Sequence, residues 1–207
     1  MAFLGIRIPH ETGRLLSKID VPGEKTSTSE MHITLLYLGD EWPISQISKA
    51  MEAAFDIVSK TKPFTAEVNK VTHFPVNPHD QDKYPIITRV ESKELHELRG
   101  KLAKKFDKEG VEYSKLHPDY KPHVTLAYSE KEPEDVSFDP LEFSISEVVL
   151  WGGDHGDDRI FVTFPLAGPE VTKNSFLLQK ASIFEKLANK PLPAFLTATV
   201  ERRKNER

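Results

Sequence analysis

A five-residue pattern occurs twice in this 207-residue chain, and any fold that it adopts must accommodate both copies. Met31-His32-Ile33-Thr34-Leu35 returns 91 residues later as Pro122-His123-Val124-Thr125-Leu126. Each copy follows a polar stretch and begins an apolar segment that favours a β-strand. The recurrence indicates a weak internal duplication, in which two strands of the same pattern occupy corresponding places.

The rest of the first 166 residues reads as strands and helices in alternation. Gly13 to Ile19 favours a short helix, the spacing of apolar residues at 44–58 predicts a long one after Pro43, and Ser92 and Gly110 suit the two ends of another. The strand at 31–38 is apolar on both faces, which predicts a central position in its sheet. The segments that favour strands are 2–8, 31–38, 64–71, 85–90, 124–128, 144–150 and 159–164, the last two joined as a hairpin through 151–158.

The composition changes near residue 167. Residues 171–207 carry eight Lys or Arg and three Asp or Glu, which leaves 20 basic and 29 acidic residues in the first 170. We expect one domain over 1–167 and a basic C-terminal extension over 168–207, with a short amphipathic helix at 175–188 and a frayed end. The basic run is typical of a solvated terminus. The apolar face of the helix needs a partner, either this body or another protein.

Several classes of protein are disfavoured by composition. The apolar stretches are shorter than the roughly 20 residues of a membrane helix, and the N-terminus lacks the pattern of a signal peptide. The absence of cysteine excludes disulfides, thiolate metal sites and cysteine nucleophiles, and it fits a cytoplasmic protein. An acidic body disfavours a long nucleic-acid footprint but is compatible with a small phosphorylated ligand.

The two His-x-Thr motifs carry the chemistry that the sequence suggests. Residues i and i+2 of a strand share a face, so His32 lies beside Thr34 and His123 beside Thr125. If the strands lie close together, they form a cleft with two imidazoles and two hydroxyls. One neutral histidine takes a proton from an attacking oxygen, a protonated one gives a proton to the leaving oxygen, and hydroxyls bind phosphate oxygens. This chemistry requires no metal and no cofactor.

The segments around residues 32–39 and 122–127 resemble the paired signatures of the 2H phosphoesterase superfamily, which includes 2′-5′ RNA ligase-like proteins and cyclic-nucleotide phosphodiesterases. The resemblance covers roughly residues 2–166. It implies an α+β fold, bilobal and pseudo-symmetric, with two antiparallel sheets around a central groove and outer helices. It also implies that His32 and His123 are the acid and base and that Thr34 and Thr125 bind phosphate.

Other polar and aromatic residues near the motifs have two interpretations each. Arg89 would pair with a phosphate if it faces the groove and with a carboxylate if it faces solvent. Lys121 lies just before the second motif and would attract a phosphate. Tyr37 and Tyr128 stand an odd number of residues after the histidines, so strict alternation turns them into the core unless a bulge intervenes. His73 and Phe74 would line the rim of the groove or simply end a strand.

The sequence therefore predicts a metal-independent phosphodiesterase that acts on a cyclic phosphate or on a 2′-5′- or 3′-5′-linked nucleotide or short RNA. One alternative is a nucleotide- or RNA-binding module with little turnover. Another is a phage-type nuclease that degrades cyclic oligonucleotide immune signals. We expect no membrane partner, and a protein partner only through the C-terminal extension.

Overall fold

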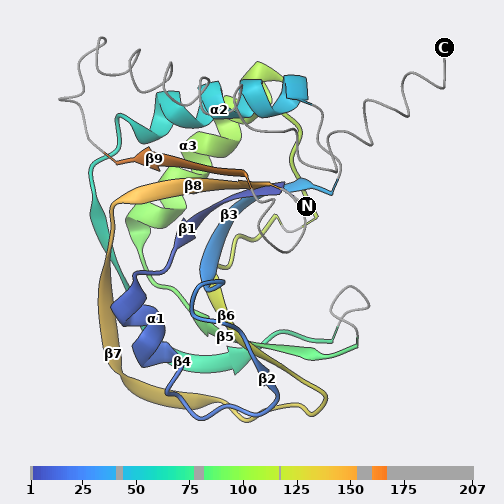
Figure 1. Cartoon of the computed structure of the whole chain (residues 1–207), viewed down its shortest axis with the longest axis vertical. Coiled ribbons are helices and arrows are strands. Elements are labelled where there is room, and N and C mark those ends of the chain that lie inside the picture. Colours follow the sequence, from blue (N-terminus) through green and yellow to red (C-terminus); the bar gives the residue numbers. More distant parts are fainter. Residues whose placement is uncertain (1, 41–43, 77–81, 117, 153–159, 167–207) are drawn as a thin grey trace.

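The computed structural model describes residues 2–40, 44–76, 82–116, 118–152 and 160–166. Within this part of the chain the fold is α+β, as predicted, with two antiparallel sheets and three helices (Figure 1). The expected C-terminal extension at 168–207, including its amphipathic helix, lies outside the described residues.

The two sheets are connected several times by the chain. The first sheet has four strands in the order β3-β1-β8-β9, and the second has five in the order β2-β6-β5-β4-β7. The second sheet curls at the lower end of Figure 1, and β7 rises from it to continue into β8 of the first sheet. The strands are β1 (Ala2–Arg7), β2 (Glu24–Lys25), β3 (His32–Gly39), β4 (Phe64–His73), β5 (Tyr84–Arg89), β6 (His123–Ser129), β7 (Val136–Ile145), β8 (Glu147–Gly152) and β9 (Ile160–Pro165).

The helices are α1 (His10–Leu16), α2 (Ile44–Val58) and α3 (Lys93–Glu109). Helices α2 and α3 pack on each other, α2 also contacts β8 and β9, and α3 contacts β3 (Figure 1). The predicted ends of α3 are confirmed: the Ser92 side chain accepts a hydrogen bond from the Leu95 amide at 3.3 Å, and Gly110 ends the helix with a φ of 66°. Such a positive φ favours glycine because it has no Cβ.

Three sequence-based expectations about elements were wrong. The strand with the first motif, β3, is an edge strand and not a central one. Its sequence reads as apolar on both faces because the pairing with β1 skips Leu35, so that Leu35 and Leu36 are both buried. The expected strand at 144–150 is two strands in different sheets, which change over at Ser146. The short helix starts earlier than predicted, at His10, directly after Pro9.

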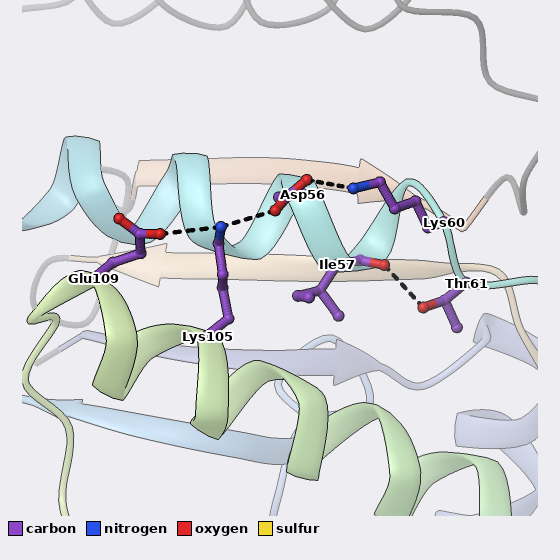
Figure 2. A network of polar contacts seen from close by, with 6 residues as sticks. All are labelled: Asp56, Ile57, Lys60, Thr61, Lys105 and Glu109. Carbon is purple, nitrogen blue, oxygen red and sulfur yellow. Dashed lines mark hydrogen bonds and ion pairs between the residues drawn. The ribbon is translucent and has the colours of Figure 1, made fainter.

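An ion-pair network joins α2 to α3 (Figure 2). The Lys105 ammonium lies 2.8 Å from the Asp56 carboxylate and 3.1 Å from that of Glu109, and Lys60 lies 2.6 Å from Asp56. Hydrogen bonds, first from Lys105 and then from Lys60, hold the pKa of Asp56 below its ordinary value. A carboxylate with a lowered pKa in the folded state stabilises the fold at higher pH, and this contribution is lost as the pH falls through that pKa.

We expect Asp56→Asn to lower the free energy of unfolding at pH 7 by about 0.5–1 kcal/mol, because the network is partly exposed to solvent. The difference from the parent should shrink as the pH falls through the lowered pKa of this carboxylate, because protonation removes its charge. Urea unfolding at pH 7 and at successively lower pH values measures it, with Asp20→Asn, an exposed carboxylate outside the network, as the control. An Asp56→Asn effect that does not change as the pH is lowered would contradict the assignment.

Candidate active site

A β-bulge interrupts β3 directly after the first motif. In the ladder between β1 and β3, Gly5 pairs with Thr34 while Leu4 pairs with Leu36, so Leu35 is the extra residue. Alternation therefore restarts one position later along β3, and burial follows the same shift: Leu35 and Leu36 are both buried.

The second motif carries a bulge at the same place. In the ladder between β5 and β6, Ile87 pairs with Thr125 while Ile86 pairs with Ala127, so Leu126 is the extra residue. The two motif strands thus share their local geometry as well as their sequence pattern, and both have the same succession of half-buried and buried residues.

The matched bulges move Tyr37 and Tyr128 to the face that carries the motif histidines and threonines. Both tyrosines are half-buried, and the expectation that they turn into the main core was wrong, since it assumed unbroken alternation. The Tyr37 hydroxyl donates a hydrogen bond to Asp40 at 2.7 Å. Burial, together with this bond, raises the pKa of Tyr37 to about 12.

The two motif strands lie next to each other although they belong to different sheets. Strand β3 is the edge of the first sheet, and it contacts β6 of the second. All four motif side chains, those of His32, Thr34, His123 and Thr125, are half-buried. The convergence of the two strands, on which the predicted site depends, is therefore present.

Each motif histidine is held by the backbone in the same way. His32 Nδ1 lies 2.6 Å from the carbonyl oxygen of Glu30, and His123 Nδ1 lies 2.8 Å from that of Lys121. A carbonyl oxygen only accepts hydrogen bonds, so Nδ1 carries the proton in both rings. In a neutral imidazole of this tautomer Nε2 is the basic nitrogen. The two rings thus present the same atom for proton transfer.

Aromatic rings pack against both histidines. The ring of Phe3 lies 4.6 Å from that of His32 and 4.8 Å from that of Trp151, on which it stacks, and the His32 and Trp151 rings are 5.7 Å apart. Phe74 packs edge-on against His123 at 4.8 Å. Phe3 and Trp151 were not predicted at the site: the first looked like an ordinary strand residue, and the second was assigned to a turn.

His73 lies away from this face. Its Nε2 is 3.2 Å from the Glu132 carboxylate, and its ring meets that of Tyr84 edge-on. Of the two residues considered for the rim, Phe74 therefore lies at the motif and His73 does not.

Arg89 occupies the position of β5 directly opposite His123. Directly opposed residues of an antiparallel pair project from the same face, so Arg89 shares the face of the second motif. Its side chain is exposed, and it forms no ion pair within the part of the chain that the structure describes. Lys121 is also exposed, and it contributes the carbonyl that holds His123.

Comparison with known proteins identifies the family. The model of the 2′-5′ RNA ligase superfamily matches residues 23–157, a stretch that contains both His-x-Thr motifs. The chain belongs to the 2′-5′ RNA ligase superfamily. The resemblance to the 2H phosphoesterases is thereby confirmed.

Several solved structures share the fold of this chain at low sequence identity. The protein TT0787 of Thermus thermophilus superposes with a TM-score of 0.66 at 20% identity, over 82% of this chain and 99% of TT0787. A protein described as a phosphoesterase gives 0.56 at 18% identity, over 80% of this chain and 94% of the other. Escherichia coli LigT complexed with 3′-AMP gives 0.56 at 17% identity, over 79% and 94%. No curated protein matches the chain in sequence.

Among the residues that the structure describes, no group of three or more His, Cys, Asp or Glu side chains is arranged to hold a metal ion. In the same part of the chain, no helix is both long enough and apolar enough to cross a membrane.

Proposed function

We propose that this protein is a phosphodiesterase that cleaves a phosphodiester bond of a nucleotide, with His32 and His123 as the acid and base. The observation that carries the proposal is the matched pair of backbone hydrogen bonds to Nδ1, on two strands that contact each other. A structural histidine needs no such match, whereas acid and base catalysis needs two imidazoles with the same nitrogen presented to the substrate.

The proton transfers balance without a further group. The neutral histidine accepts a proton at Nε2 from the attacking oxygen, the new P–O bond forms, and the protonated histidine gives its proton to the leaving oxygen as the old P–O bond breaks. If a 2′-hydroxyl of the substrate attacks, the product is a 2′,3′-cyclic phosphate. If water attacks, such a cyclic phosphate is opened. Each cycle of one reaction leaves the two histidines in exchanged protonation states.

The remaining side chains of the site would bind the substrate. Thr34 and Thr125 have hydroxyls that can donate to the non-bridging oxygens of the reacting phosphate. Arg89, one strand beyond His123, and Lys121 add positive charge for the substrate on the side of the second motif. The half-buried rings of Tyr37 and Tyr128 supply apolar surface on which a base can stack, whereas Phe3 and Trp151 are buried and back the site. LigT, a distant relative, has been crystallised with 3′-AMP, ATP and NADP+, which supports a nucleotide as the ligand. A nucleotide substrate and the absence of cysteine favour action in the cytoplasm.

A turnover screen in the presence of a chelator tests the proposal. The substrates are 2′,3′-cyclic nucleotides, 2′-5′ and 3′-5′ dinucleotides, and cyclic di- and trinucleotides, with the His32→Ala/His123→Ala double variant as the control. We expect the parent alone to cleave at least one of them, and the preferred substrate distinguishes RNA-end processing from the degradation of cyclic signals. Tight binding of a substrate without its cleavage would refute the proposed phosphodiesterase activity and favour a nucleotide-binding module.

A further inference from the structure

The first motif has an arginine in the same place as the second. Arg7 is the last residue of β1 and lies directly opposite His32, just as Arg89 is the last residue of β5 and lies opposite His123. Directly opposed residues share a face, so Arg7 projects from the face of the first motif. Its side chain is exposed. It is also the one charged residue of a strand whose other five residues are buried, the same composition that drew attention to Arg89.

The order of the strands places Arg7 beyond the reacting phosphate. A phosphate that meets both histidines lies between β3 and β6, because these are the strands that carry them. Strand β3 is the edge of its sheet and β1 is the next strand inward, so Arg7 lies behind His32 as seen from β6. Neighbouring strands are about 4.8 Å apart. A guanidinium on β1 is therefore placed for an anionic group that is attached to the substrate on the β3 side of the cleaved bond.

The charges of the residues around the motif histidines support an anion-binding role for Arg7. The first 170 residues carry 29 acidic and 20 basic side chains, yet the residues directly opposite the motif histidines, Arg7 and Arg89, are both arginines. The two residues whose carbonyls hold the histidines are one acid, Glu30, and one base, Lys121. Arginine binds phosphate through two parallel hydrogen bonds, which lysine cannot do. A phosphate is thus the anion that suits an exposed arginine beside this site.

We propose that Arg7 binds a second phosphate group of the substrate, one strand beyond the diester that is cleaved. This inference rests on the proposed function and specifies its substrate: a nucleotide or oligonucleotide with at least one phosphate besides the reacting one. Arg7 acts as a specificity residue, since it contacts neither the attacking nor the leaving oxygen.

The test compares three dinucleotides with the same cleavable linkage: one without a terminal phosphate, one with a 5′-phosphate and one with a 3′-phosphate. The parent should show a kcat/KM about tenfold higher for one of the two phosphorylated forms, as expected for one charge-assisted contact. Arg7→Gln should remove this preference, and Arg7→Lys should retain part of it. Arg14→Gln, an exposed arginine that pairs with Glu11 on α1, is the matched control and should keep the preference.

The outcomes separate this inference from the proposed function. Cleavage without a preference, or a preference that survives Arg7→Gln, overturns the second-phosphate site and leaves the phosphodiesterase intact. If the parent cleaves none of the three or of the earlier panel, the proposed function fails, and calorimetric titration of the same three dinucleotides decides the site. A phosphorylated form that binds the parent more tightly than it binds Arg7→Gln then supports the site, and equal affinities overturn it.

Discussion

Replacement of either His32 or His123 by alanine is expected to lower kcat by about 10²- to 10⁴-fold, the usual contribution of a general acid or base. Each ring is positioned by a backbone carbonyl, so each removal deletes one proton-transfer group and leaves the sheet ladders in place. The reduction in kcat of the double variant should be smaller than the product of the two single reductions, because one missing proton transfer already blocks the step. Steady-state kinetics with the substrate found in the screen measures both.

The pH dependence of kcat/KM in the same variants shows which histidine acts as the acid and which as the base. A reaction that needs one neutral and one protonated histidine has a bell-shaped dependence of kcat/KM on pH. The variant that lacks the base should lose the acidic limb, and the variant that lacks the acid should lose the basic limb. His10→Ala, an exposed histidine on α1 beside Glu11, is the control and should leave both limbs unchanged. Activity within tenfold of the parent in either motif variant would refute the mechanism.

Thr34→Val and Thr125→Val are each expected to lower kcat/KM by about 10²-fold, the cost of removing one donor from a site that stabilises a developing oxyanion. Valine has nearly the shape of threonine, so the strand should keep its β-propensity while the hydroxyl is lost. Steady-state kinetics with the screened substrate measures the effect in each variant.

Serine provides the matched test of the threonines, because Thr34→Ser and Thr125→Ser keep the hydroxyl and should retain most of the activity. Thr65→Val on β4, an exposed threonine outside the site, controls for the general effect of the substitution. Serine variants as impaired as the valine variants would show that the threonines act through packing of the strand and not as donors to phosphate.

Much of the local structure could be predicted because it depends on residues close in sequence. The capped helix from Lys93 to Glu109 follows from Ser92, Gly110 and the apolar stripe between them. The pairing of His32 with Thr34 on one strand face follows from the period of a strand alone. The same holds for His123 with Thr125, and two copies of this short pattern were enough to indicate the family.

Other features depend on contacts between distant segments, so a single sequence could not supply them. The bulges exist because β1 and β5 pair with the motif strands in a register that skips one residue, and only that register turns Tyr37 and Tyr128 toward the histidines. Gly5 permits this ladder, because a Cβ there would come within 2.6 Å of the Ile33 carbonyl oxygen. The sequence does not reveal this requirement for glycine at position 5, because the close contact forms only when β3 pairs with β1.

Local and long-range features differ in their physical cause. The residues that share a strand face and the ends of the helices follow from the sequence, because the steric and hydrogen-bonding preferences of neighbouring residues set them. The position of β3 as an edge strand beside β6, and of Arg7 opposite His32, follows only from the folded structure. Strand order and register are fixed by the burial of whole sheet faces, which sums contributions from segments more than a hundred residues apart.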